Sequence, residues 1–291
     1  MSETVQQIDI KQIQQKQLEI LVYFRDFCRE NGLKFFLAGG TCLGAKRHQG
    51  FIPWDDDVDV FMLRDDYEKL REIWEEKADT ERYGYVRSCK EFNIHHSATE
   101  IKDNNTTFIN HHSKDLDINQ GIMIDVIPMD AVAPGKFTRI TQMIYAMAYC
   151  LFNFQRLPEH KGKLTYYASK IALGVIRSDS LRYKIWKFCE KRHSRFDVKK
   201  CTHVASFGEG GAIMRQHFPV EWFSDMETVL PFEGYDMPVA KDTHQYLTIS
   251  YGDYMQLPPE EDRVFRHNIH FMDLTKSYKE YKGIAYCVDK K

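Results

Sequence analysis

The sequence predicts an α+β fold, in which a mixed β-sheet core is flanked by helices and carries a helical insert. Two observations predict it. Segments with helical and with strand periodicity alternate over roughly the first 130 residues. From 136 to 200 the pattern changes to long helical periodicity, rich in aromatic and basic residues, and 201–291 returns to turns and short elements.

Helices and strands alternate at the beginning of the chain. Residues 10–30 have apolar residues at helical spacing, and the Asn-Gly pair at 31–32 ends this helix. The stretch LKFFLA at 33–38 predicts a short buried strand. A Gly-Gly turn at 39–40 and a short helix capped by Thr41 follow.

The next elements continue this alternation. Residues 57–63 are apolar and β-branched enough for a strand despite their acids, and RDDYEKLREIWEEKA then predicts a helix. Further short strands are expected at 83–88, 98–103 and 106–109. The stretch GIMIDVIPMD at 121–130 predicts the last strand before the insert.

The changes of pattern divide the chain into three regions. We expect a core with an N-terminal helix at 1–135, a helical insert or subdomain at 136–200, and a part at 201–291 that completes the domain begun by the core. The insert has two interpretations. It is a subdomain packed against the core, or its basic and aromatic helical faces make peripheral contact with a membrane.

Composition excludes several classes of protein. With 291 residues, 43% of them hydrophobic, the chain can bury a large core, and its net charge of -2 provides no overall positive field for nucleic acid. Seven scattered cysteines without C-x-x-C spacing indicate reduced thiols. The start of the chain lacks the pattern of a secretory signal. We therefore expect a cytoplasmic protein, at most peripheral at the inner face of the membrane.

Four aspartates crowd the stretch WDDDVDV at 54–60. Carboxylates this dense need water, a partner or a cation. In an extended strand Asp57 and Asp59 share a face, so both can converge on a hard divalent cation. Asp125 is the third acid, because it also lies among apolar strand residues, where a lone carboxylate is costly. These three residues predict a catalytic site for Mg²⁺ or Mn²⁺.

Two other interpretations of the acidic stretch stay open. It is a solvated turn before a strand, or it is a calcium loop, since Asp55, Asp57 and Asp59 fit D-x-D-x-D. The calcium loop is disfavoured because Val60 stands where that loop needs glycine, and Asp66 stands where it needs glutamate.

Residues just before the acids predict a phosphate site. Gly39 and Gly40 let backbone amides approach a phosphate, and the helix that begins at Thr41 adds its positive end. Arg47 and His48 are natural further contacts to a phosphate. The alternatives are an ordinary strand-to-helix turn and a solvated helix end.

Three stretches carry a family resemblance: GGTCLGAKRHQGFIPWDDDVDV, GIMIDVIPMD and YLTISYGDYMQLPP. In this order they resemble the LicD family of phosphocholine transferases, in the polymerase-β-like nucleotidyltransferase superfamily, and are similar to the catalytic domain of fukutin-related protein. The resemblance implies a nucleotidyltransferase-like fold. It also implies metal-dependent transfer of phosphocholine, or a related phospho-substituent, from CDP-choline or another CDP-linked donor. The implied acceptor is a hydroxyl of a cell-envelope glycan, such as a lipid-linked teichoic acid or lipopolysaccharide sugar.

The resemblance also assigns residues. Asp57 and Asp59 fall on the family's metal-binding pair and Asp125 on its third acid, as a base or as a ligand of a second ion. Lys102 lies in a stretch similar to a family segment near the cleft, which implies contact with the donor; an ordinary hairpin is the alternative. Trp54, beside the acids, is a candidate for binding a choline head through cation–π attraction or for core packing.

Rival functions and a rival metal are also considered. A transferase of the same superfamily can move a nucleotidyl group and release pyrophosphate, and a non-catalytic module can sense a nucleotide or glycan. The costly carboxylates argue against an idle module. The histidine pairs at 95–96 and 111–112 raise the question of zinc, but they lack cysteine spacing and an H-E-x-x-H pattern, so we expect surface histidines.

Overall fold

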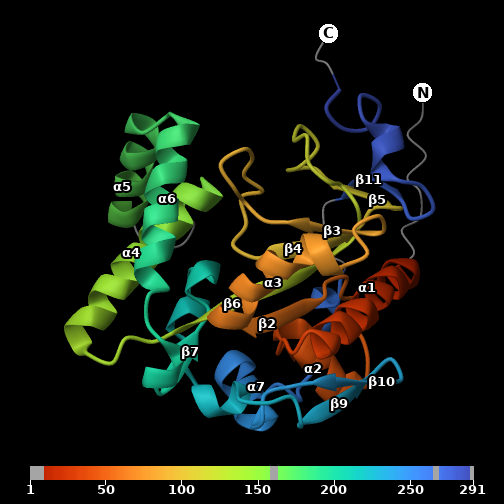
Figure 1. Cartoon of the computed structure of the whole chain (residues 1–291), viewed down its shortest axis with the longest axis horizontal. Helices are drawn as coiled ribbons and strands as arrows, with labels where there is room; N and C mark the ends of the chain where they lie inside the picture. Colours follow the sequence, from red (N-terminus) through yellow and green to blue (C-terminus); the bar gives the residue numbers. More distant parts are fainter. Residues whose placement is uncertain (1–9, 158–162, 265–268, 289–291) are drawn as a thin grey trace.

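The computed structural model describes residues 10–157, 163–264 and 269–288, and its elements confirm a mixed α/β fold (Figure 1). The helices are α1 (Ile10–Glu30), α2 (Gly39–His48), α3 (Arg64–Lys77), α4 (Lys136–Phe154), α5 (Lys163–Val175), α6 (Asp179–His193) and α7 (Thr243–Tyr251). The strands are β1 (Phe36–Leu37), β2 (Asp59–Leu63), β3 (Tyr83–Val86), β4 (Thr99–Asp103), β5 (Thr107–Asn110), β6 (Met123–Ala131), β7 (His203–Ala205), β8 (Phe218–Pro219), β9 (Val229–Phe232), β10 (Tyr235–Pro238) and β11 (Ile269–Asp273).

One mixed sheet forms the core, with β6 at its centre. The strand order is β1-β2-β6-β4-β3, and β7 and β8 extend the sheet from the far end of β6. β6 runs parallel to β2 and antiparallel to β4 and β7. The apolar residues of the central strands are buried, together with the inner faces of α1 and α3. Smaller two-stranded sheets pair β9 with β10 and β5 with β11.

Three local predictions need correction. The predicted strand 57–63 begins only at Asp59, because the backbone before it forms an irregular loop. The predicted cap Thr41 lies inside α2, whose N-cap is Ala38. The long helical pattern after 163 is broken into α5 and α6, since Ser178 caps a new helix.

Figure 1 shows α4, α5 and α6 together at one side of the molecule, beside the sheet. They lie where the sequence predicts a helical insert. The division into three regions stays a prediction. In the described part of the chain, none of the helices combines the length and the apolar character needed to span a bilayer.

A buried charge cluster fixes α6 to the sheet. Arg64, at the start of α3, donates to both carboxylate oxygens of Asp130 in β6, at 2.6 and 3.0 Å. Arg87 donates to Glu190 of α6 at 2.7 Å, and His193 Nδ1 lies 3.3 Å from Asp130 Oδ2. Burial alone would raise the pKa of Asp130, but the guanidinium of Arg64 holds it well below its ordinary value.

Asp130→Asn is expected to lower the free energy of unfolding by about 3 kcal/mol, because the buried Arg64 would lose its bidentate carboxylate partner and keep only Glu68 and Glu190. Urea unfolding at neutral pH measures the loss. Asp179→Asn is the matched control, since Asp179 is exposed at the start of α6, and should change stability by less than about 1 kcal/mol. Equal losses in the two variants would contradict the role given to the cluster.

Candidate active site

Three carboxylates form a row across the middle of the sheet. Asp59 of β2 is in parallel register with Asp125 of β6, and Asp125 is in antiparallel register with Glu100 of β4. Residues in register on neighbouring strands point to the same face of a sheet. Asp59, Asp125 and Glu100 therefore stand side by side on one face.

The loop before β2 adds three more acids to the row. Asp55, Asp56 and Asp57 each present a carboxylate oxygen, and these oxygens lie within 4.8 Å of one another. Helix α1 holds the loop through two amides one turn apart. Gln14 Nε2 donates to the carbonyl of Asp55 at 2.7 Å, and Gln17 Nε2 donates to that of Asp56 at 2.5 Å. The loop is thus fixed against the helix.

The charges at this site act on one another. Burial raises the pKa of Asp59 well above its ordinary value, and the charges of Asp125 and Asp57 raise it further. Burial also raises the pKa of Asp125, and although His96 opposes the rise, Glu100 and Asp57 add to it. Without a cation, the site therefore holds negative charge at a cost in free energy.

His96 lies beside the row of acids. Its Nδ1 is 3.8 Å from Asp125 Oδ2, and His96, Glu100 and Asp125 each offer a ligand atom within 4.8 Å of the others. Burial alone would lower the pKa of His96, but the carboxylates of Asp125, Glu209 and Glu100 raise it. This residue therefore adds a nitrogen ligand, or a positive charge, to the acidic site.

The donor set fits a hard divalent cation. Asp125 Oδ1 is buried and has no hydrogen-bond partner among the residues that the structure describes, which is the state expected of an oxygen that ligates an ion. Carboxylate oxygens are the ligands that Mg²⁺ and Mn²⁺ prefer, and Mn²⁺ also accepts imidazole. The structure groups Asp57 with the loop acids and Asp125 with His96, while Asp59 lies on the strand between them.

The glycines at the start of α2 make room for the acids. Gly39 has a positive φ of 48°, and a Cβ there would lie 3.1 Å from Asp59 Oδ2. A Cβ on Gly40 would lie 2.7 Å from Asp55 Oδ2. The Gly39 amide donates to the Tyr246 hydroxyl at 2.8 Å. The predicted phosphate contacts at these glycines stay a prediction. The acids give a second reason for glycine at both positions, because a side chain there would meet their carboxylates.

Thr41 positions one of the acids. Its hydroxyl oxygen accepts a hydrogen bond of 2.9 Å from the Asp59 amide, so it ties α2 to the first residue of β2. Thr41 is buried, as expected of a residue that supports the site from within. The place of Thr41 in the predicted phosphate site stays a prediction.

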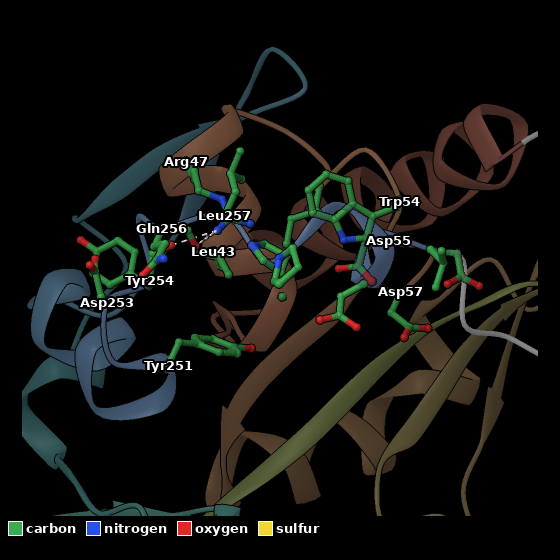
Figure 2. A pocket seen from close by; sticks show the side chains of 17 residues that line it. Leu43, Arg47, Trp54, Asp55, Asp57, Tyr251, Asp253, Tyr254, Gln256 and Leu257 are labelled. Atoms are coloured by element: carbon green, nitrogen blue, oxygen red, sulfur yellow. Dashed lines mark hydrogen bonds between the residues drawn. The ribbon is translucent and has the colours of Figure 1, made fainter.

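A pocket of about 620 Å³ opens beside the acidic loop (Figure 2). Asp55 and Asp57 lie at one side of it, and Tyr251 extends toward them from the C-terminal end of α7. Burial raises the pKa of the Tyr251 hydroxyl, and the charges of Asp59 and Asp55 raise it further. Arg47 lines the same pocket.

Two arginines lie near each other at this pocket. Arg47 Nη1 donates to the carbonyl of Tyr254 at 2.9 Å, and burial together with the charge of Arg263 lowers the pKa of Arg47. The Arg263 guanidinium lies 5.6 Å from the centre of the Trp54 ring. That face of Trp54 therefore already holds a cation, which leaves its choline role without support. His48 packs edge-on against Trp54, and Arg47 Nε lies 3.0 Å from His48 Nε2.

Lys102 is buried in the sheet. Its ammonium lies 3.0 Å from Glu100 Oε2 and donates to the carbonyl of Gly121 at 3.4 Å. It therefore neutralises the outer member of the acidic row, and its predicted contact with a donor stays a prediction.

Sequence reasoning missed several of these residues. Glu100 carries no signal of its own within TEIKD, because only the register with Asp125 reveals its place. His96 was noticed as one of a pair, but its position beside Asp125 depends on the fold. The helical pattern at 10–30 assigns no role to Gln14 or Gln17, because their carbonyl partners lie about forty residues away in the chain.

Gly40→Ala is expected to reduce turnover by about tenfold to a hundredfold. The new Cβ would lie only 2.7 Å from Asp55 Oδ2, so the Asp55 carboxylate would have to move. The measurement is steady-state turnover of the purified variant. Gly174→Ala is the control, since a Cβ there meets open space, and it should leave turnover unchanged. If Gly40→Ala keeps full turnover, Asp55 does not need its observed position.

Comparisons with known proteins match this chain to a family model and to curated relatives. Residues 32–126 match the family model described as LicD/FKTN/FKRP, nucleotidyltransferase domain. The chain is 28% identical, over 86% of its length and 92% of the relative, to the lipopolysaccharide cholinephosphotransferase LicD of Haemophilus influenzae. An uncharacterised Rickettsia prowazekii protein is 46% identical over 44 residues, 16% of its own length. The predicted resemblance to the LicD family is thereby confirmed.

Proposed function

We propose that this chain, whose residues 32–126 match the LicD-family nucleotidyltransferase domain, transfers phosphocholine, or a related phospho-substituent, from a CDP-linked donor to a hydroxyl of a cell-envelope glycan. The observation that carries the proposal is the row of Asp59, Asp125 and Glu100 beside the loop acids. The name of the Haemophilus influenzae relative supports a choline phosphate group and a lipopolysaccharide acceptor.

The acids would hold the metal that such a transfer needs. Asp57, Asp59 and Asp125 would ligate Mg²⁺ or Mn²⁺. When bound, the cation would offset the charge of the donor diphosphate and of the leaving CMP. Asp125 Oδ1, which is buried and has no hydrogen-bond partner among the described residues, can serve as such a ligand or accept the proton of the attacking hydroxyl.

The larger pocket is the place we assign to the donor. The positive charge of Arg47 is disfavoured there by burial and by the nearby charge of Arg263. An anion bound beside Arg47 would offset this cost. A diphosphate is such an anion, and guanidinium groups bind it through charge-assisted hydrogen bonds. Tyr251 and the acidic loop close the same pocket. The donor phosphorus would then lie between the arginine and the acids.

A second pocket, of about 180 Å³, lies on the other side of the acidic loop and is the place we assign to the acceptor. It shares Asp56 and Asp57 with the larger pocket, and His96, Glu100 and Asp125 also line it. A hydroxyl entering here would meet Asp125 from the side opposite the donor, as in-line transfer requires.

The test is incubation of the purified protein with Mg²⁺, acceptor extract and a panel of CDP donors that includes CDP-choline, CDP-ethanolamine and CDP-ribitol. CMP and pyrophosphate are measured in parallel, with CTP and phosphocholine as the second substrate set. CMP release from one CDP donor, without pyrophosphate from CTP, is the expected result. Pyrophosphate release would assign nucleotidyl transfer instead, and neither product would indicate a binding module.

A further inference from the structure

The outward face of α4 is apolar. Phe137, Ile140, Ile144 and Met147 are spaced three and four residues apart, so they form one stripe, and their exposed fractions are 85, 51, 52 and 47%. The opposite face of α4 packs into the core through residues such as Ala146. A helix that is apolar on both sides is normally covered on both sides. The structure leaves the outer side of α4 uncovered.

The neighbouring helices α5 and α6 also expose large apolar side chains. α5 exposes Tyr167, Ile171 and Val175, and α6 exposes Leu181 and Phe188. With the α4 stripe, these are nine of the twenty large hydrophobic residues found exposed in the described part of the chain, although the three helices are a small part of it. Exposed apolar side chains concentrated in this way mark an interaction surface. We call these nine residues the insert surface.

The charges around the insert surface are almost all positive. α4 and α5 contain no acidic residue, and α6 contains only Asp179 and Glu190. Glu190 is buried in the charge cluster with Arg87. Among the residues whose exposure the structure describes, the exposed basic residues of the three helices are Lys136, Arg139, Lys170, Lys184 and Lys191. The surface therefore combines apolar side chains with positive charge, while the whole chain has a net charge of -2.

We infer that the insert surface binds an anionic lipid bilayer, with the α4 stripe inserted at the boundary between head groups and acyl chains. Apolar side chains flanked by lysines are what such binding requires, since the lysines attract the anionic head groups. A second copy of this chain fits less well. A symmetric dimer would place one basic surface against another, and Asp179 is the one exposed acid of these helices.

The far end of α4 reaches the acidic site. Asn153 in its last turn donates from Nδ2 to the carbonyl of His96 at 3.0 Å, and its own carbonyl accepts from Asn93 Nδ2 at 2.8 Å. Its carbonyl also lies 3.1 Å from His95 Nδ1. The helix that would contact lipid thus holds the loop that lines the smaller pocket. This last step rests on the proposed function: a lipid-linked acceptor would then enter the smaller pocket from the membrane side.

Vesicle sedimentation with the full chain tests the inference. The probes are vesicles of phosphatidylcholine alone and of phosphatidylcholine with about 30% phosphatidylglycerol, at low and high salt. We expect binding to the anionic vesicles that falls with salt. Ile144→Glu should weaken it at least about tenfold. Ile284→Glu is the matched control, because Ile284 is an exposed isoleucine outside the insert, and should bind as the unchanged chain does.

Several outcomes would overturn the inference. One is that the chain fails to sediment with anionic vesicles, and another is that it sediments equally with neutral ones. An equal loss of vesicle binding in Ile144→Glu and Ile284→Glu would also overturn it. A dimer that Ile144→Glu dissociates, without vesicle binding, would assign the surface to a second copy. CMP release with a soluble donor is measured on the same samples. If it is unchanged in Ile144→Glu, a loss of vesicle binding is separate from any failure of the proposed function.

Discussion

Asp59→Asn and Asp57→Asn each lower CMP release by at least about a hundredfold to a thousandfold. Both residues would lose a charged oxygen that holds the cation. Asparagine keeps the shape of aspartate, so the fold is expected to persist. The measurement is turnover at saturating donor and Mg²⁺, with Asp236→Asn as a control, because Asp236 is exposed on β10, away from the acidic loop in sequence. Unchanged turnover in either site variant would remove that residue from the site.

The two variants should differ in stability. Asp59 has a pKa raised by burial and by neighbouring acids, so its ionised form costs folding free energy in the metal-free protein. The contribution of such a group to the free energy of unfolding is fully present below the ordinary aspartate pKa of about 3.9. It is lost as pH rises through the raised pKa of Asp59. Asp59→Asn should therefore melt higher than the unchanged chain in chelator at pH 8. The difference in melting temperature between the two proteins should shrink toward pH 4.

Asp57 provides the contrast, because its side chain is exposed. Asp57→Asn is expected to leave the melting temperature of the metal-free protein nearly unchanged, while it removes activity. Each kcal/mol gained corresponds to about 2 to 4 °C in a chain of roughly this size, so calorimetry resolves the difference. An Asp59→Asn variant that melts lower than the unchanged chain would show that Asp59 stabilises the fold through a contact other than the cation.

Removal of divalent cations should abolish CMP release, and addition of Mg²⁺ or Mn²⁺ should restore it. The expected loss is at least about a thousandfold, because the donor diphosphate and the six acids of the site would otherwise repel each other. Chelation by EDTA followed by gel filtration prepares the metal-free protein. Turnover is then titrated against each cation.

A thermal measurement separates metal binding from other effects of EDTA. Binding to the folded state raises the melting temperature in proportion to the logarithm of cation concentration. Mn²⁺ should raise it in the unchanged chain and much less in Asp59→Asn. Full turnover in the metal-free protein, or the same Mn²⁺ shift in both proteins, would contradict a cation at the acidic row.

The sequence was informative wherever a single segment decides its own structure. The helical spacing at 10–30 corresponds to α1 (Ile10–Glu30), and the strands predicted at 98–103 and 121–130 correspond to β4 and β6. These segments carry their own burial pattern. The sequence predicted less well where contacts with distant residues decide the structure. Asp57 was predicted to begin a strand, but it lies in the acidic loop, and β2 begins only at Asp59.

The site was predictable in its acids but not in its arrangement. Dense aspartates are costly anywhere, so Asp57, Asp59 and Asp125 stood out from the sequence alone. Glu100 joins them only through strand register, and His96 only because Asn153 of α4 holds its loop. Such residues are ordinary in sequence, and their chemistry comes from long-range contacts. The helical insert was predicted as helices, but the sequence left open which face would stay exposed.

The central claim is that the inward acids hold a divalent cation. Crystals grown with Mn²⁺ and a CDP donor analogue, measured at the manganese absorption edge, test it most directly. The account predicts an anomalous peak bounded by the carboxylates of Asp57, Asp59 and Asp125, with the diphosphate of the donor against it. Active protein whose crystals show no peak at these carboxylates, with the donor bound at another surface, would contradict it.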